Sequence, residues 1–448
     1  MTVAAANFGY GRISDQSRNR LSCRGDEERN QGTWIDMDNI YFITSGFVDI
    51  TPEGPLPLAG YRGLRKPNFD GVCDPIEANV VILRSNGSSL ALISLDLLYV
   101  GAYLQEQIVQ GLSGRVAASG ILLSASHTHF APATEKSLSI LGPVNQDYLK
   151  FVAERVIGLA LRLFNEQGSA VSLEYFEGIA SHSINRRKKK FGIIRGFPFL
   201  GSRVKIVPNI SGPRDDMIRL IRARDQNGRD LAICWSYACH PIGFPKINDL
   251  SAEYPGVVRK MLRAEYGDIP IVFWQGFSGN ISPYRLWRTS GPHTSNPEFE
   301  FVSPSLNDWT EWAASLARCV IAAAKGTGTP VRGPISHRFT TLALGELGLV
   351  SNKKLGFSEM GIGPNLVICG LTAEVAVEYG EILREMHAPA RVIMVGCVGD
   401  VFGYLPVDTM VSEGGYEVVG FIKRFGLTGS FSSNVSSIVK DRLFLRAK

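Results

Sequence analysis

Short apolar runs with the length of buried β-strands alternate with helical patterns along most of this chain of 448 residues. The runs lie at Asn79–Leu83, Leu90–Ser94, Gly120–Ser124, Met217–Ile221, Leu231–Trp235 and Pro270–Trp274. Strands that alternate with helices along a chain are typical of α/β proteins, in which helices cover the faces of β-sheets. The alternation therefore predicts an α/β fold with a layered architecture.

Two amphipathic patterns predict helices that pack on the core. Between Asp147 and Phe164, apolar residues recur at three- and four-residue steps with charged residues between them, which is the spacing of one buried helix face. A second helix is expected to end near Lys325, with Asn307 or Asp308 as its N-cap.

A third helix is expected after the buried strand Asn365–Cys369, from about Glu374 to Met386. Glu374 would then lie at the strand-to-helix turn. A carboxylate in that position has an ordinary structural explanation, because a negative charge is stabilised at the N-terminal end of a helix.

Residues 1–40 are rich in Arg, Asp, Asn, Ser and Gly without apolar periodicity, so they are predicted to be a flexible N-terminal extension. Residues 41–448 are predicted to form a single domain. We see no signal peptide and no run approaching about 18 apolar residues, so no transmembrane span is expected. The seven cysteines form no C-x-x-C motif, which indicates reduced thiols and a cytoplasmic location.

The formal net charge of +5 is modest, and no basic stripe with aromatic platforms accompanies it. Nucleic acid is therefore not an expected partner. The one dense basic run, Arg186–Lys190, is predicted to be a solvated loop. The stretch Thr289–Pro297 is rich in turn-forming residues and is predicted to be a loop over the functional site.

Two histidines, His127 and His129, follow the apolar run that ends at Ser124. Side chains repeat every second residue along a strand, so both imidazoles are expected on one face with their Cα atoms roughly 7 Å apart. One could bind a metal while the other stands beside it, because neutral imidazole is a common metal ligand. An isolated pair of this kind is more often hydrogen-bonded to neighbouring backbone groups. A metal site is therefore indicated only if other parts of the chain supply further ligands.

Further motifs accompany the histidine pair in a fixed order. They are Phe47–Pro52, Pro57–Tyr61, Ser94–Leu97, Ser183–Arg186, Tyr237–Pro241, Ser251–Gly256, Gly279–Pro283, Leu371–Glu374, Gly403–Pro406 and Gly415–Glu417. In this order and spacing, the chain resembles the catalytic domain of the neutral/alkaline non-lysosomal ceramidase family. The resemblance implies layered mixed β-sheets with flanking helices. Members of this family typically carry a C-terminal immunoglobulin-like domain, but none is expected here, because the 44 residues after Tyr404 (448 − 404) are too few for one.

The resemblance also implies a set of site residues. The implied zinc ligands, for one ion per chain, are His127, His240, Glu374 and Tyr404. The implied catalytic residues are His129, Arg186, Ser282 and Tyr416. Two imidazoles and a carboxylate match a common catalytic zinc site, whereas a tyrosine ligand is unusual. Taken singly, His240 would be interpreted as a core histidine and Tyr404 as a surface-anchored aromatic residue. Asp96 and Glu253 are expected to orient the ligand imidazoles from behind.

The implied reaction is hydrolysis of the amide bond of an N-acylated substrate, ceramide-like or another small molecule, by zinc-activated water. His129 would exchange protons with that water or the leaving amine. Arg186 and Tyr416 would stabilise the oxyanion. Attack by Ser282 is disfavoured, because its surroundings lack the G-x-S-x-G elbow typical of serine hydrolases.

Two alternatives to an amidase stay open. The same zinc site could serve an esterase or lactonase, because amides and esters both pass through a tetrahedral oxyanion. A non-catalytic binding protein could also keep the fold, although it would have little need of charged and imidazole groups that converge on one pocket.

Overall fold

The computed structural model describes residues 41–61, 63–193, 200–288 and 299–445, and residues 38–448 form one compact unit. The predicted extension at residues 1–40 and the predicted loop Thr289–Pro297 lie outside the described residues. Within the described residues, no helix is both long and apolar enough to cross a membrane. The cysteines in this part of the chain are free thiols.

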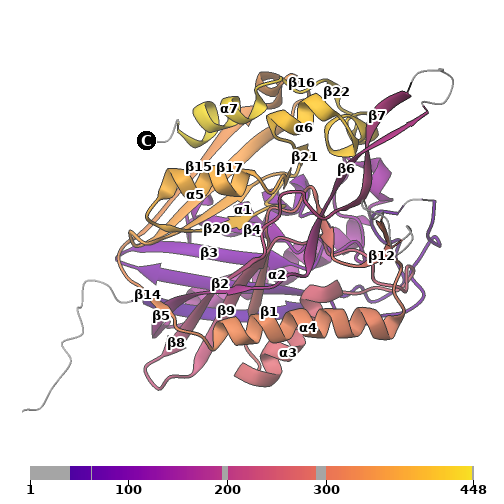
Figure 1. Cartoon of the computed structure of the whole chain (residues 1–448). Coiled ribbons are helices and arrows are strands. Elements are labelled where there is room, and N and C mark those ends of the chain that lie inside the picture. The colour runs from indigo at the N-terminus through magenta and orange to yellow at the C-terminus, as the bar shows by residue number, and fades with distance from the viewer. Residues whose placement is uncertain (1–40, 62, 194–199, 289–298, 446–448) are drawn as a thin grey trace, which may run out of the picture. The chain divides into compact units, whose positions relative to one another are not determined.

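A large mixed sheet forms the centre of the fold, with the strand order β10-β9-β8-β5-β1-β2-β3-β4 and with β14 paired to β5 (Figure 1). Its strands are β1 (Tyr41–Asp49), β2 (Glu77–Ser85), β3 (Ser88–Leu95), β4 (Ile121–Ala125), β5 (Ser169–Ile179), β8 (Met217–Asp225), β9 (Asp230–Tyr237), β10 (Ile271–Gln275) and β14 (Thr329–Val331). The pairs β3–β4 and β9–β10 are parallel, whereas the other pairs are antiparallel. All six strands predicted from apolar runs are present in this sheet.

A second sheet packs against the inner face of the first. It has the order β15-β17-β18-β20, and its strands are β15 (Ile335–Ala343), β17 (Lys354–Ile362), β18 (Leu366–Leu371) and β20 (Arg391–Val395). The apolar layer between the two sheets contains Leu92 and Trp274 from the first sheet and Met360 and Ile368 from the second. Side chains that alternate along each strand therefore divide between this inner core and the two outer helical layers.

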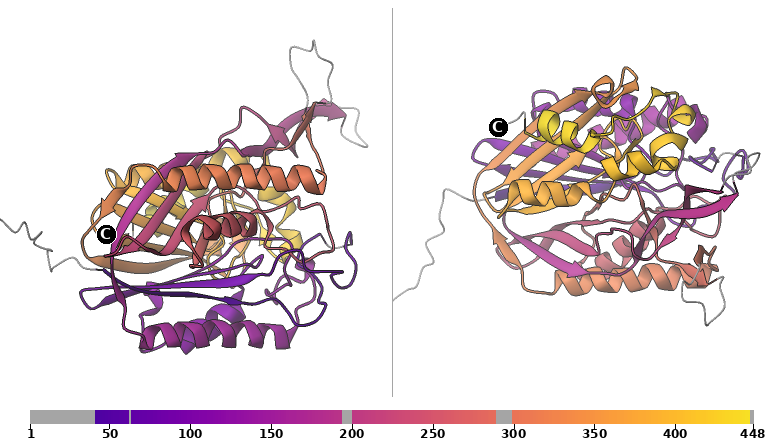
Figure 2. Two further views of the ribbon diagram at one scale, coloured as in Figure 1. Left: turned by 90° about the horizontal axis from the view of Figure 1, so that it is seen from below. Right: turned by 45° about the horizontal axis from the view of Figure 1, so that its top comes forward.

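Helices cover the outer faces of both sheets, which gives four layers (Figure 2). The helices on the large sheet are α1 (Ala102–Gly111), α2 (Gln146–Asn165), α3 (Glu253–Tyr266) and α4 (Leu306–Ala324). The smaller sheet is covered by the C-terminal part of the chain, which includes α5 (Tyr379–His387), α6 (Asp408–Glu413) and α7 (Val435–Val439). The predicted α/β fold of layered mixed sheets with flanking helices is confirmed.

The helix predictions were correct in part. The first helix is α2, and the second is α4, but its N-cap is Ser305, whose Oγ accepts a hydrogen bond from the Asp308 amide at 3.2 Å. The third prediction was wrong at its start, because helix α5 begins only at Tyr379. Glu374 instead begins the short strand β19 (Glu374–Val375), which runs parallel to β21 (Tyr404–Leu405).

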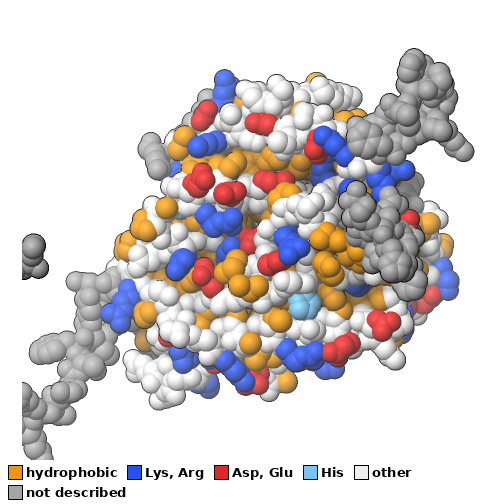
Figure 3. Space-filling view, viewed as in Figure 1, with side chains coloured by type: hydrophobic (Ala, Val, Ile, Leu, Met, Phe, Trp, Pro, Cys, Tyr) orange, Lys and Arg blue, Asp and Glu red, His pale blue; other side chains and the backbone are white. Residues whose placement is uncertain are grey.

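The basic run is not a solvated loop. It lies in β6 (Ser183–Ile193), the middle strand of a small sheet in which β11 (Ile281–Pro283) and β7 (Leu200–Asn209) are its neighbours. Arg186 and Arg187 are buried there. Two further pairs of short strands complete the fold. Those pairs are β12 (Leu286–Arg288) with β13 (Phe299–Phe301) and β16 (Leu349–Val350) with β22 (Thr428–Gly429). Acidic and basic side chains are interspersed on the face shown in Figure 3.

Backbone contacts join the two large sheets at one end. The amide of Ala125, at the end of β4, donates to the carbonyl of Cys397 at 3.1 Å. The amide of Gly396, just after β20, donates to the carbonyl of Gln275 at 2.7 Å. The carboxyl ends of β4 and β10 and the loop after β20 therefore meet at this junction, as is common at the carboxyl ends of strands in α/β folds.

Candidate metal centre

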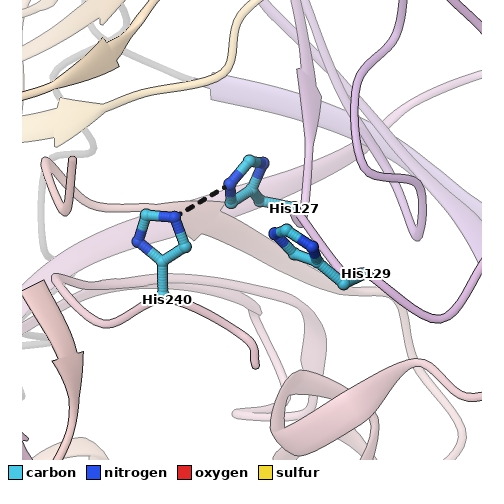
Figure 4. Close-up of side chains that lie close together, drawn as sticks. All are labelled: His127, His129 and His240. Atoms are coloured by element: carbon cyan, nitrogen blue, oxygen red, sulfur yellow. Dashed lines mark hydrogen bonds between the residues drawn. The ribbon is translucent and has the colours of Figure 1, made fainter. Parts of the chain in front are cut away.

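His127 and His129 lie in the loop after β4, and their rings are close together (Figure 4). The ring centroids are 5.2 Å apart and nearly perpendicular. The strand geometry predicted for this pair was wrong, because β4 ends at Ala125 and His127 has a φ of 68°. The left-handed backbone at His127 turns the chain sharply, so loop geometry brings the two imidazoles together.

His240 reaches the same point from the loop after β9 (Figure 4). Its Nε2 lies 3.2 Å from Nε2 of His127, and both side chains are buried. Nitrogen atoms of His127, His129 and His240 all lie within 4.8 Å of one another, so these three residues are one candidate group for a metal ion.

Backbone carbonyls fix the orientation of two of these rings. Nδ1 of His127 lies 2.9 Å from the carbonyl oxygen of Leu98, and Nδ1 of His240 lies 2.8 Å from that of Ser278. A carbonyl oxygen only accepts hydrogen bonds, so in each ring Nδ1 donates and Nε2 faces the site. Backbone carbonyls, and not the predicted carboxylates of Asp96 and Glu253, therefore orient these two imidazoles.

Asp96 and Glu253 contact neither imidazole, so that prediction was wrong. Asp96 accepts hydrogen bonds from the Arg259 guanidinium at 2.6 Å and from the Glu77 amide at 2.9 Å. Glu253 accepts from the backbone amides of Phe244 and Tyr254 at 2.9 and 2.7 Å. Both carboxylates are buried and serve the scaffold near the site.

Glu374 brings a carboxylate to the histidines from β19. Its Oε2 lies 3.0 Å from Nε2 of His240 and 3.4 Å from Nε2 of His127. Its Oε1 accepts a hydrogen bond from the hydroxyl of Tyr99. Because β19 pairs with β21 in the register Glu374 to Tyr404, the phenol of Tyr404 is presented beside this carboxylate.

The donor set fits a cation. Because a carbonyl holds Nδ1 of each ring, Nε2 of His127 and of His240 face each other and a carboxylate oxygen of Glu374. Burial by itself lowers the pKa of His127, but Cys397 and Glu374 outweigh it and raise that pKa well above its ordinary value, so this cluster attracts positive charge. Two nitrogen ligands of a tetrahedral zinc ion, each about 2.0 to 2.1 Å from the metal, lie about 3.3 Å apart, which matches the 3.2 Å separation of these atoms.

Arg186 extends the site beyond the histidines. Its Nη2 donates to the Gly279 carbonyl at 2.7 Å and to the Tyr404 hydroxyl at 3.3 Å, while its Nε donates to Glu417 at 2.9 Å. The ring of Tyr416 lies 5.5 Å from that of Tyr404, centroid to centroid. The structure therefore brings Arg186 and Tyr416 to the same side of the site.

His129 differs from the other two histidines. Neither of its ring nitrogens has a hydrogen-bond partner within the described residues, although both are buried. Burial, and after it the neighbouring His127 and His240, lower the pKa of His129 well below its ordinary value. Burial and Arg186 lower the pKa of His240 to about 4. Both rings are therefore neutral near pH 7.

The carboxyl of Glu374 is ionised in the same surroundings. Burial by itself raises its pKa, but the contacts with His127 and His240 outweigh burial and hold that pKa well below the ordinary range. A neutral imidazole beside an ionised carboxylate is the protonation state in which both groups bind metal ions.

A pocket of about 520 Å³ opens onto these groups, a size typical of small-molecule sites. His129, His240, Glu374, Tyr404, Arg186, Ser282 and Tyr416 all line it, and apolar side chains of Leu98, Ile140, Leu141, Phe301 and Phe425 form much of the remaining wall. The residues expected to act together thus share one cavity, except that His127 is buried behind it.

Sequence reasoning missed several groups that hold the site. Tyr99 supports Glu374, and Glu417 pairs with both Arg186 and Arg187 at 2.9 and 2.7 Å. The carbonyls of Leu98 and Ser278 carry no side-chain signal at all. Glu417 could have been suspected, because it directly follows Tyr416 in one of the recognised motifs.

Comparison with known proteins supports the fold. No protein-family profile matches the chain. The solved neutral ceramidase from Pseudomonas aeruginosa superposes with a TM-score of 0.71 at 16% identity, over 90% of this chain and 73% of that one. A ceramidase complexed with C2 gives 0.71 at 15% identity, over 90% of this chain and 74% of that one. The predicted resemblance to neutral ceramidases is confirmed in the fold.

Proposed function

We propose that this protein is a metal-dependent hydrolase that cleaves the amide bond of an N-acylated substrate. The observation that carries the proposal is the convergence of His127 Nε2, His240 Nε2 and Glu374 Oε2, which lie 3.0 to 3.4 Å from one another. The ceramidase fold around this cluster favours amide hydrolysis over a purely structural metal.

The residues that would hold the ion are His127, His240, Glu374 and Tyr404, and the ion we propose is a single zinc. When bound, zinc supplies a Lewis acid that makes water nucleophilic near neutral pH and polarises a carbonyl group. The imidazole and carboxylate donors suit zinc, and Tyr404 completes the set from the strand beside Glu374.

His129 is proposed to carry protons in the reaction. Its two ring nitrogens are free of partners within the described residues, and its low pKa keeps it neutral near pH 7, so that a ring nitrogen has a lone pair available for a proton. Its position at the pocket wall, 5.2 Å from the His127 ring by centroids, places it beside the reacting groups.

Arg186 and Tyr416 are proposed to stabilise the negative charge that develops on the carbonyl oxygen. The guanidinium of Arg186 is fixed by Glu417 and by the Gly279 carbonyl, so it is pre-organised as a donor. Ser282 lines the same pocket and is proposed to contact the substrate. The apolar wall formed by Leu141 and its neighbours would take the acyl chain.

The test is metal content and amide hydrolysis measured on the same preparations. We expect about one zinc per chain in the purified protein, and loss of hydrolysis of N-dodecanoyl amides when a chelator removes it. His240→Ala should lose the metal. His129→Ala should keep it but slow hydrolysis by about 100-fold or more.

A matched control is His337→Ala, because His337 contacts Ser119 and lies outside the pocket. That variant should keep both metal and activity. Equal metal loss in His240→Ala and His129→Ala would contradict the roles assigned here and would make His129 a ligand instead. Hydrolysis that persists without metal would refute the proposal.

A further inference from the structure

The pocket carries more positive charge than its own acids neutralise. Its lining includes the guanidiniums of Arg186, Arg285 and Arg424, but Glu374 is the only carboxylate among the described lining residues. Glu374 is engaged with the histidines, and Arg186 is paired with Glu417. Arg285 and Arg424 therefore remain without a counter-charge in the pocket.

Arg285 is a largely buried cation that forms no ion pair within the residues that the structure describes. Its guanidinium donates to the carbonyls of Gly243 and Ile242 at 2.9 and 3.1 Å, and its buried Nε has no partner in the described part of the chain. Glu253 is the acid whose charge acts on it. Glu253 forms no ion pair with it, and burial raises the pKa of Glu253 to about 7, so its negative charge is only partial near neutral pH.

Arg424 stands at the same pocket on a short helical turn, Lys423–Phe425. Its guanidinium carbon lies 5.6 Å from the centroid of the Tyr416 ring, and it forms no ion pair with the described residues. It is exposed, so it can reach a bound molecule at the pocket mouth.

A third guanidinium, that of Arg65, lies behind the histidines. It packs between the rings of Tyr61 and Phe130 at 4.9 and 4.8 Å and donates to the His129 carbonyl at 2.6 Å. Its Nε and Nη2 are buried without partners within the described residues. Within the described residues, none of these three guanidiniums forms an ion pair, and they lie in or beside one pocket. Their charges produce a positive potential there, which the apolar walls strengthen.

We infer that the substrate is an anionic amide, whose carboxylate binds Arg285 and Arg424 while its acyl chain lies on the apolar wall. The inference rests on the proposed function and specifies its substrate class. A neutral lipid amide would leave the largely buried guanidinium of Arg285 without a counter-charge and poorly hydrated, which is unfavourable. A carboxylate would give each of the two arginines a charge-assisted hydrogen bond, for which the planar guanidinium is well suited.

The experiment compares matched substrates with the zinc-loaded protein. One pair is N-dodecanoylglycine and N-dodecanoylglycinamide, which places the carboxylate on the amine half. The other is the monoamide of a long dicarboxylic acid and its methyl ester, which places it on the acyl half. In at least one of the two pairs, we expect the carboxylate substrate to have a kcat/KM about 10-fold or more above that of its neutral partner.

Variants then test the two arginines. Arg424→Gln should lower the ratio of kcat/KM between carboxylate and neutral substrate about 10-fold, whereas Lys423→Gln, one residue away and outside the pocket, should leave that ratio unchanged. Arg285→Lys keeps the charge but loses the planar fork, so its ratio should fall less than that of Arg285→Gln. Equal ratios in wild type and all variants would overturn the inference.

A binding measurement separates this inference from the proposed function. In ketomethylene analogues of the first pair, CH₂ replaces the amide N–H, so they cannot be cleaved. Tighter binding of the carboxylate analogue in calorimetry, lost in Arg424→Gln, supports the inference even if no amide is hydrolysed. Equal affinity for both analogues, together with hydrolysis of neutral amides, would overturn the inference and leave the proposed function standing.

Discussion

Replacing Glu417 by Gln should destabilise the protein strongly and disturb the site at the same time. Glu417 is 1% exposed at its side chain and receives Arg186 and Arg187, whose side chains are 6% and 4% exposed, at 2.9 and 2.7 Å. Breaking a buried ion pair from one side costs about 3–5 kcal/mol, because it leaves an uncompensated charge inside. We expect a loss in this range for Glu417→Gln.

The matched control is Glu413→Gln. Glu413 also contacts Arg187, at 3.5 Å, but its side chain is 30% exposed, so its loss should cost only about 0–1 kcal/mol. Urea unfolding of both variants with metal bound, followed by circular dichroism, measures the difference. Equal losses in the two variants would refute the argument from burial.

The pH dependence of stability gives a second readout of the same carboxylate. Burial by itself raises the pKa of Glu417, but Arg186 and Arg187 outweigh it and lower that pKa below the ordinary value of 4.5. The stabilisation is therefore fully present above about pH 4.5 and is lost as the pH falls through the lowered pKa. Wild type and Glu417→Gln should converge in stability at low pH, and a constant difference would contradict this account.

Two other substitutions test the scaffold. Gly279→Ala should reduce metal retention, because the added Cβ would lie 2.6 Å from the backbone oxygen of Glu374. The control is Gly158→Ala, in helix α2 with open space around it, which should keep the metal and stabilise the protein by about 0.5–1 kcal/mol in urea unfolding. Metal loss in both variants or in neither would contradict this prediction. Contacts with His387 and Arg338 outweigh burial and lower the pKa of Glu359 from 4.5 to about 2. The difference in unfolding free energy between wild type and Glu359→Gln should therefore be full above pH 4.5 and vanish near pH 2. A difference that grows on acidification would be incompatible with these contacts.

Local elements of the fold could be predicted because they depend on patterns within short stretches. The apolar runs that became β2, β3, β4, β8, β9 and β10, and the periodicity of α2, report which faces are buried. Element boundaries were less predictable. Glu374 was expected at a helix start, but pairing with Tyr404 across β19 and β21 extends the backbone there instead, and such pairing between distant segments leaves no periodic signal.

Sequence motifs predicted the residues of the candidate site but not the groups that orient them. The resemblance indicated His240, Glu374 and Tyr404, and the fold brings them together with His127. The partners of the imidazoles are carbonyls, which any residue type provides, so sequence could not single them out. Asp96 was the plausible candidate by type, but Arg259 from helix α3 engages it.

The sequence by itself determined the layers, because burial imposes a period on each strand and helix that its own residues must satisfy. Only the tertiary structure decided which polar groups meet. The carboxylate of Glu417 lies 230 positions from Arg187 along the chain but 2.7 Å from its guanidinium. Such a contact forms because a buried charge must find an opposite one, and which one is near depends on how the whole chain packs.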